Sequence, residues 1–517
     1  MHNTNEIPGA EERNEISPKP DIAGRKGKPR KYPVRVLGVI VLTAVILILN
    51  HIASLCFDRP RDADYYNYDM ARLQKDQAPV DMIIVGASQV YHGCNPMVIS
   101  EQMNIGEVVD CGAAVGYADG LYYMLRDLLR RFTPECVVID MPWHRFREYR
   151  DPAARTGMYL CSDRLNWSDK LDYALHCYGL KDWANLVPVY RYGESVWSLG
   201  QLLKNYHNKK AVAEGRWEEA GKTDYQKNGF KWTRKSCPQG SIPALDEFYS
   251  EEQNSEYIKK YIRMMQQLCE EKGIPVIFIT IPRSMMELYS VENYQGAADY
   301  ITEFAKELGC PYLNFNYLKD REEIMTDSLF SDKVHLNGEG SVVFSGILAD
   351  AVQKTLDGED VSGLFYRNLS ELKEDVHRIV ACNGRVWPNG DGTLTVEAKS
   401  FQNEDVTPQY RLMLIKETKT VSEDDEADGE NAGDVESILQ SVEGESAEDG
   451  EAEDALFQVS ELQVLRPWQE ETVFLLNEEE IPEGYALRLE TRRKGQERTE
   501  AYVNRLTDEF QVKRNEG

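Results

Sequence analysis

The sequence has no pair of cysteines in C-x-x-C spacing, although ten cysteines are scattered between Cys56 and Cys382. Structural zinc sites usually use such closely spaced pairs, so this spacing argues against a zinc knuckle or ribbon. We expect the cysteines to be small core residues, with one or two disulfides as the alternative if the chain is exported. The sequence predicts no metal site and no cofactor.

Basic residues are also in the minority, since 59 Lys and Arg face 87 Asp and Glu in a chain of net charge −28. Binding of nucleic acid needs clustered Lys and Arg, so we expect no nucleic-acid partner. The imbalance is uneven, because the segment from Glu423 to Asp454 contains no Lys or Arg. We expect residues 422–454 to form a disordered acidic loop, which lacks the spacing of an EF-hand calcium loop.

There is one long hydrophobic run, over residues 36–57. A helix of about 22 residues is ~33 Å long, which is enough to cross a bilayer, so we expect a single transmembrane helix. A cleaved signal peptide is the alternative, although its apolar region is normally shorter. Six Lys and Arg residues lie just before the run, between positions 25 and 35, whereas Asp and Arg residues are mixed after it. Residues 1–35 are therefore predicted to be a disordered basic tail in the cytoplasm. Everything after Phe57 is then predicted to lie outside the cell membrane.

Short apolar runs alternate with amphipathic segments over residues 58–365. The predicted buried strands are 82–85, 107–110, 136–141, 275–281 and 312–315. The predicted helices are 119–132, 256–272, 297–308 and 338–356. This alternation, with nearly continuous apolar strands, indicates an α/β domain whose parallel sheet is covered by helices on both faces. Ligands bind such sheets beyond the carboxyl ends of the strands.

Two segments depart from this alternation. Residues 147–249 are rich in Tyr and Trp, and we expect a helical insertion. Its aromatic side chains either form its core or line a groove for sugar rings. Residues 370–517 contain β-forming runs separated by turn signals, which predict a small β-sandwich domain. That domain is either a binding module for carbohydrate or a partner, or a structural extension.

Two polar motifs lie at the ends of predicted elements. Ser88 directly follows the first predicted strand, and Asp332 and His335 stand three residues apart just before the last helix. A histidine base oriented by an aspartate can activate a serine hydroxyl as a nucleophile. Each motif alone has another interpretation, with Ser88 as a helix N-cap and Asp332 as an N-cap beside a loop histidine. His92 and Cys94 lie near Ser88, but two such groups do not make a metal site.

The stretches I-V-G-A-S, ending at Ser88, and D-K-V-H-L-N, residues 332–337, resemble the SGNH (GDSL-like) hydrolase superfamily. The resemblance implies a flavodoxin-like three-layer α/β fold and a triad of Ser88, His335 and Asp332. It also implies that Ser88 and Gly116 donate backbone N–H groups to the oxyanion. The asparagine that the family places in its third block is missing here, and His144 either donates in its place or is a structural histidine. This chain departs from the family pattern at residue 87, where alanine replaces the usual aspartate.

A membrane segment ahead of such a domain is similar to the teichoic acid D-alanyl transfer proteins and the alginate O-acetylation proteins. This narrower resemblance implies a membrane-bound O-acyltransferase as partner, the lipid bilayer as anchor, and a cell-envelope polysaccharide or teichoic-acid-like polymer as substrate. The expected function is therefore an extracytoplasmic serine esterase or O-acyltransferase. The alternative is a non-catalytic envelope assembly or glycan-binding protein that works with the same membrane enzyme.

Overall fold

The structure is a computed structural model that describes residues 32–57, 59–114, 116–146, 152–186, 198–221, 223–236, 247–419, 457–503 and 506. The predicted acidic loop 422–454, and all of the predicted tail before residue 32, lie outside the described residues. The chain divides into two compact units, Met1–Ser54 and Leu55–Gly517, which are described separately.

The first unit contains most of helix α1, which runs over Tyr32–Cys56 and includes the segment predicted to cross the membrane. Its large apolar side chains between Val36 and Ile52 are 45 to 64% exposed where they are described. Within the described part of the chain, we find no helix that is long and apolar enough to span a membrane. The prediction of a transmembrane helix over 36–57 is therefore matched by a helix there, but the membrane span itself is not supported.

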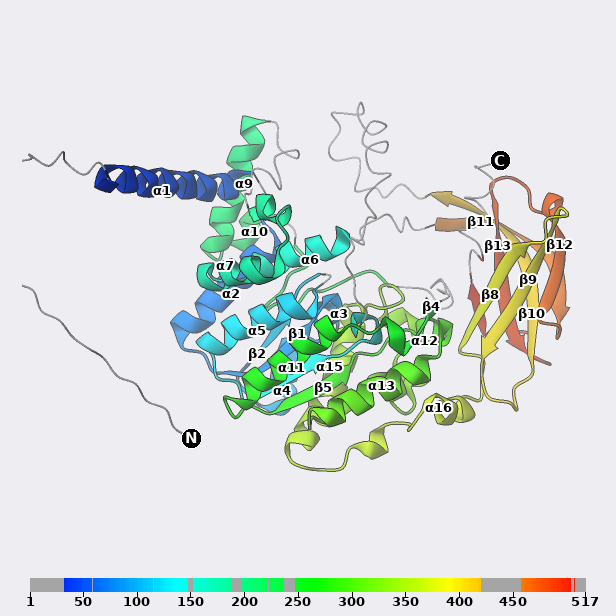
Figure 1. The fold of residues 1–517 in the computed structure, drawn as a ribbon. Helices are drawn as coiled ribbons and strands as arrows, with labels where there is room; N and C mark the ends of the chain where they lie inside the picture. The colour runs from blue at the N-terminus through cyan, green and yellow to red at the C-terminus, as the bar shows by residue number, and fades with distance from the viewer. Residues whose placement is uncertain are drawn as a thin grey trace, which may run out of the picture. The chain divides into compact units, whose positions relative to one another are not determined.

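The second unit is built on a parallel sheet of five strands in the order β2-β1-β3-β5-β7 (Figure 1). The strands are β1 Val80–Gly86, β2 Glu107–Gly112, β3 Cys136–Asp140, β5 Val276–Thr280 and β7 Tyr312–Asn314. Nearly all their side chains are buried, which explains why the strands read as continuous apolar runs. The predicted α/β fold with a parallel sheet is confirmed.

The order of the strands changes direction between β1 and β3. From β1 the chain passes to β2 on one side, and then returns to β3 on the other side of β1. Such a switch point leaves a crevice beyond the carboxyl ends of the two central strands, which is where ligands bind in doubly wound sheets. The residues that follow Gly86 and Asp140 therefore line the place where a ligand is expected.

The helices around this sheet fall into two packed groups. Helix α5 packs against α11, while α15 packs against α3 and α4 (Figure 1). The helices of this part are α2 Asp62–Asp76, α3 Ser88–Gly93, α4 Pro96–Met103, α5 Ala118–Arg131, α11 Glu256–Glu270, α12 Met285–Ser290, α13 Tyr294–Glu307, α14 Arg321–Ile324, α15 Gly338–Leu356 and α16 Leu369–Asp375. A short parallel pair, β4 Glu247–Phe248 and β6 Val291–Glu292, lies outside the main sheet.

The described part of residues 147–249 contains several helices. Its elements are α6 Pro152–Ser162, α7 Trp167–Cys177, the 3-10 helix η2 Asp182–Leu186, α9 Leu199–Ala213 and α10 Trp217–Ala220. Tyr173 is buried and its ring lies 5.0 Å from that of Tyr123 on α5. Trp217 packs edge-on against Tyr65 of α2 and Tyr225. These aromatic side chains form packed core, whereas Trp167 is exposed.

Two antiparallel sheets follow the α/β part. One has the order β11-β10-β13-β14 and the other β12-β9-β8. Their strands are β8 Ala381–Pro388, β9 Thr393–Phe401, β10 Pro408–Lys419, β11 Phe457–Gln469, β12 Val473–Asn477, β13 Tyr485–Arg493 and β14 Ala501–Val503. Alternate side chains of β9 and β12 are buried, which is the pattern of a sheet with one face on a core. The arrangement of residues 370–517 as a sandwich domain stays a prediction.

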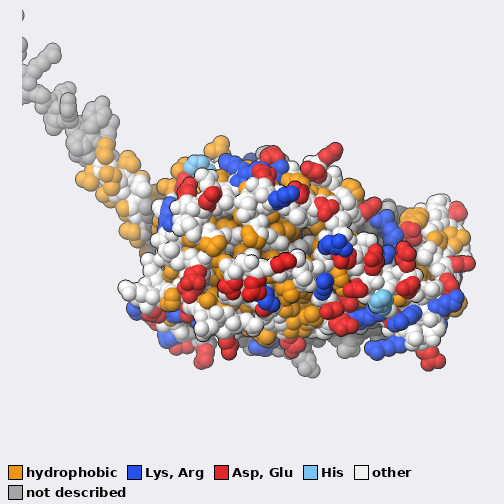
Figure 2. Space-filling model, turned by 90° about the horizontal axis from the view of Figure 1, so that it is seen from below, with side chains coloured by type: hydrophobic (Ala, Val, Ile, Leu, Met, Phe, Trp, Pro, Cys, Tyr) orange, Lys and Arg blue, Asp and Glu red, His pale blue; other side chains and the backbone are white. Residues whose placement is uncertain are grey.

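Figure 2 shows one face of the molecule, where acidic and basic side chains are mixed with apolar ones. Among the side chains coloured on this face, Lys and Arg do not gather into a continuous band.

Candidate active site

Ser88 is the first residue of α3 and stands two positions after the end of β1 at Gly86. Glycine is needed at that strand end, because a Cβ on Gly86 would lie 2.2 Å from Cγ2 of Val90 in the helix that follows. The N-cap of α3 is Ala87, so the alternative interpretation of Ser88 as an N-cap is wrong. The Oγ of Ser88 lies 2.7 Å from Nε2 of His335 instead.

His335 and Asp332 lie in a tight loop just before α15. The loop is closed by the N–H of Ser331, which donates to the carbonyl of His335 at 2.9 Å. The N-cap of α15 is Asn337, whose side-chain oxygen accepts from the N–H of Gly340. Asp332 is therefore not the cap of this helix, and its carboxylate is available to the histidine.

The carboxylate of Asp332 holds the imidazole in place. Its Oδ2 lies 2.7 Å from Nδ1 of His335. Its Oδ1 accepts from the backbone N–H groups of Val334 and His335, each at 2.8 Å. With its proton on Nδ1, the imidazole donates a hydrogen bond to Asp332, and Nε2 is left to accept from the Ser88 hydroxyl. The structure thus brings the three predicted triad residues into one chain of contacts.

The pKa of Asp332 is set by opposing effects. Burial is the largest of them and acts to raise the pKa of this carboxyl. The hydrogen bond and charge of His335, together with the N–H groups of Val334 and His335, outweigh burial and lower the pKa to about 2. Asp332 is therefore ionised at any pH at which an esterase is normally assayed, and it can stabilise the imidazolium that forms when His335 takes a proton.

We predict that, as the pH is lowered from about 9 to about 4, log(kcat/KM) for ester cleavage falls along an acid limb whose limiting slope is one. Neutral His335 accepts the Ser88 proton and protonated His335 cannot, so uptake of one proton stops the reaction. Asp332 adds no second proton in this range, because its pKa is lowered to about 2. Initial rates across this range test the slope, with circular dichroism at each pH as a control for folding. A flat profile, or a slope of two, would contradict this account.

A second histidine lies against the first. The ring centroid of His92 is 5.4 Å from that of His335, with the two rings edge to face. Burial, and then the charges of His335 and Lys231, lower the pKa of His92 well below its usual value. Its Nδ1 lies 2.8 Å from Oγ1 of Thr233. His92 is therefore a neutral neighbour that supports the ring of His335. Among the described residues, no group of three or more His, Cys, Asp or Glu side chains is arranged to hold a metal ion.

The predicted oxyanion donors are otherwise engaged. The N–H of Gly116 donates to the carbonyl of Ala113 at 3.0 Å, so this turn must open before the N–H can reach an oxyanion. The Nδ1 of His144 receives a hydrogen bond from the guanidinium of Arg283. Ser88 stands at the N-terminus of α3, where backbone N–H groups have no partner within the helix. The oxyanion roles of Ser88, Gly116 and His144 stay predictions.

Arg283 is itself held in place within the protein. Its guanidinium pairs with Glu287 at 2.8 Å, and both side chains are almost fully buried. Its backbone N–H donates to the side chain of Asn316 at 3.0 Å. This pairing fixes the guanidinium that contacts His144 and satisfies its charge within the protein.

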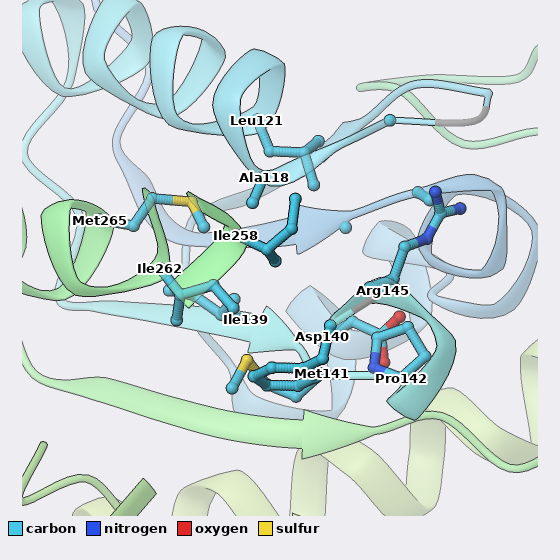
Figure 3. A pocket seen from close by; sticks show the side chains of 14 residues that line it. Ala118, Leu121, Ile139, Asp140, Met141, Pro142, Arg145, Ile258, Ile262 and Met265 are labelled. Carbon is cyan, nitrogen blue, oxygen red and sulfur yellow. The ribbon is translucent and has the colours of Figure 1, made fainter. Parts of the chain in front are cut away.

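A small cavity of about 30 Å³ lies beside the strand ends (Figure 3). Its apolar wall comes from helices α5 and α11, with Leu121, Ile258, Ile262 and Met265 in its lining. Its polar end is formed by Asp140 and Arg145, as Figure 3 shows. Its lining also includes Ala87, next to Ser88, and Gly116. The space is large enough for about one water molecule.

Asp140 and Arg145 are the two charged residues that line this cavity, and Asp140 is buried. Burial raises the pKa of Asp140 to about 7, against the lowering effects of the Ile281 N–H and of Arg283 and Arg145. Burial likewise lowers the pKa of Arg145. Sequence reasoning placed neither residue in the site. Their positions just after the third strand were the only available signal, because strand ends gather polar groups at this edge of the sheet.

No family model matches the sequence, and no curated protein matches it. Solved structures that resemble the fold include a GDSL-like lipase from Bacteroides thetaiotaomicron, with 12% identity and a TM-score of 0.27 over 57% of this chain and 100% of that one. A putative acylhydrolase from Bacteroides fragilis has 12% identity and a TM-score of 0.27, over 55% of this chain and 95% of that one. A psychrotrophic esterase from Pseudoalteromonas has 10% identity and a TM-score of 0.25, over 54% and 98%. The proposal below therefore rests on the geometry of the triad.

Proposed function

We propose that this protein is a serine esterase or O-acyltransferase that forms an acyl-enzyme on Ser88. The observation that carries the proposal is the continuous relay from Ser88 Oγ to His335 Nε2, and from His335 Nδ1 to Asp332, with 2.7 Å at each contact. A serine hydroxyl is a weak nucleophile by itself and becomes effective when a positioned base removes its proton.

The two halves of the reaction follow from this relay. Ser88 Oγ bonds to the ester carbonyl carbon while its proton passes to Nε2 of His335. The ester C–O bond then breaks, and the leaving alcohol takes the proton from Nε2. In the second half, His335 takes a proton from water or from a sugar hydroxyl, whose oxygen attacks the acyl carbon on Ser88. The bond between that carbon and Ser88 Oγ then breaks, and Oγ takes the proton back from Nε2. Hydrolysis and transfer differ only in this acceptor.

The acceptor that we propose is a hydroxyl of a cell-envelope polysaccharide or teichoic-acid-like polymer, supplied with acyl groups by a membrane-bound O-acyltransferase. The support is the resemblance of the Ser88 and Asp332–Asn337 motifs, together with the apolar helix ahead of them. Incubation of the chain with an acyl ester and a candidate glycan, followed by mass spectrometry of the glycan, tests transfer. Release of the acyl group to water alone, at every glycan concentration, would favour hydrolysis.

A non-catalytic assembly or glycan-binding protein is the second candidate. The engaged N–H of Gly116 favours it, because this predicted donor would have to leave the Ala113 carbonyl before it could reach an oxyanion. The two candidates separate by reaction of the full chain with a fluorophosphonate, which acylation-competent serines attack. A catalytic protein is labelled at Ser88, and a binding protein is not.

We also propose that the chain lies on the outer surface of the cytoplasmic membrane, in contact with its lipid. Support comes from exposed apolar side chains in stripes on two helices, with Trp167, Leu171 and Leu175 on α7 and Leu199, Leu203 and Tyr206 on α9, between 38 and 73% exposed. Exposed apolar patches of this kind mark surfaces that bind partners or membranes. Helix α9 also contacts the end of α1, since the Asn205 side chain donates to the carbonyl of Cys56 at 3.0 Å.

A photoreactive residue in place of Leu203 should crosslink to lipid when the full chain is reconstituted in liposomes. The reason is that the 52% exposed Leu203 lies on the same helix as Asn205, which is bonded to the end of α1. The matched control is the same residue in place of Val343 on α15, which is 36% exposed. Lipid adducts at 203 and not at 343 support the proposal. Equal adducts, or none at 203, would contradict it.

A further inference from the structure

Arg145 is a partly buried cation whose side chain has no hydrogen-bonded partner among the described residues. Its Nε is buried with no partner, and the guanidinium lies over the ring of Tyr117, with 5.7 Å from Cζ to the centroid. Three arginines that are buried are satisfied at least in part, since Arg283 pairs with Glu287, Arg164 donates to the Leu160 carbonyl and Arg321 donates to Asn316. The Arg145 guanidinium has no such contact, so its N–H groups can donate to a group that enters the cavity.

Asp140, the acidic neighbour of Arg145, neutralises the charge of Arg145 only in part. Asp140 lines the same cavity, but its buried Oδ2 has no hydrogen-bond partner and its other oxygen accepts from the Ile281 N–H. Burial raises the pKa of Asp140 to about 7, so near neutral pH it is ionised only in part. The polar end of the cavity therefore keeps positive character.

The cavity that holds Arg145 adjoins the nucleophile. Arg145, Ala87 and Gly116 share its lining, and Ala87 immediately precedes Ser88. Its volume of about 30 Å³ suits one small group, such as a single oxygen. The remaining lining is mainly apolar, which strengthens the interaction between an anion and a guanidinium by excluding water.

We propose that Arg145 stabilises the oxyanion of the tetrahedral intermediate on Ser88, in the role predicted for His144. This inference rests on the proposed function of Ser88. As Ser88 Oγ bonds to the carbonyl carbon, the electron pair of the C=O bond moves onto the oxygen, where it meets the guanidinium N–H groups. The pair returns when the leaving group departs, and Arg145 neither gains nor loses a proton. Arginine suits this task because it offers several fixed donors and remains charged.

The test compares Arg145→Met and Arg145→Lys with wild type in steady-state hydrolysis of an activated ester by the full chain. We expect Arg145→Met to lower kcat by about 10²- to 10³-fold, with KM changed less than about threefold. Arg145→Lys keeps the charge and should recover part of the rate, which also covers the case in which the methionine variant fails to fold. The matched control is Arg164→Met, which removes an arginine that does not line the cavity and should leave kcat near that of wild type.

Three results would overturn the inference. An unchanged kcat in Arg145→Met means that the guanidinium does not meet the oxyanion. A raised KM with unchanged kcat means that Arg145 binds an anionic group of the substrate in the ground state. An inactive wild-type chain would contradict the proposed function of Ser88, and with it the role of Arg145. This result differs from the first two, because in those the wild type is active.

Discussion

Ser88→Ala and His335→Ala should each lower kcat for an activated ester by about 10⁴- to 10⁶-fold, and the double variant should be no slower than either. The reason is that the two residues act as one unit: the 2.7 Å contact makes the histidine the acceptor of the serine proton. Without the serine there is no acyl acceptor, and without the histidine the serine keeps its proton. Removal of the second member then costs nothing further.

The measurement is the release of p-nitrophenol from p-nitrophenyl acetate by the full chain, with thermal unfolding as a control for each variant. Ser168→Ala and His176→Ala are the matched controls, since both residues are exposed on α7. Both controls should retain wild-type rates. Losses that multiply in the double variant would contradict the relay, because independent contributions do not arise from one proton transfer.

Asp332→Asn should lower kcat by about 10⁴-fold while the loop keeps its conformation. The side-chain oxygen of asparagine can still accept from the N–H groups of Val334 and His335, where Oδ1 now accepts. The amide NH₂ then faces Nδ1 of His335 in place of Oδ2. Nδ1 becomes an acceptor, so the proton moves to Nε2, which can no longer accept from Ser88.

Kinetics at pH 8 and thermal unfolding test this second prediction. The control is Asp350→Asn on α15, where the carboxylate pairs with Lys354 and its side chain is 47% exposed. We expect the control to match wild type within about twofold and Asp332→Asn to unfold near the wild-type temperature. A loss below about tenfold would mean that another group fixes the tautomer of His335, and the role of Asp332 as its partner would be withdrawn.

The sheet and the triad could be predicted because their signals are local in sequence. Strands buried on both faces read as short apolar runs, as in Met82–Val85 and Cys136–Asp140. The Asp332 and His335 motif lies within one tight loop, and the topology places that loop beside the residue after β1. Local spacing and the rule that strand ends meet at one edge were therefore sufficient.

The surroundings of the triad could not be predicted, because they depend on contacts between residues far apart in the chain. His144 and Arg283 are 139 positions apart, and Thr233 and His92 are 141 apart. The expected place of an oxyanion donor was assigned by motif alone, so His144 was chosen and its neighbour Arg145 was not. Arg283 pairs with Glu287, whereas the Nε of Arg145 has no partner. This difference depends on packing in the folded chain and is not visible in the sequence.

Reaction of the full chain with a fluorophosphonate, followed by peptide mass spectrometry, tests directly whether Ser88 is a nucleophile activated by His335. Attack by Ser88 Oγ on phosphorus expels fluoride and leaves a stable phosphonyl ester on the serine. We expect one adduct, on the peptide that contains Ser88. Its rate of formation should fall sharply in His335→Ala and stay unchanged in His176→Ala. An unlabelled Ser88 in a folded chain, or labelling that does not depend on His335, would contradict an activated serine at this site.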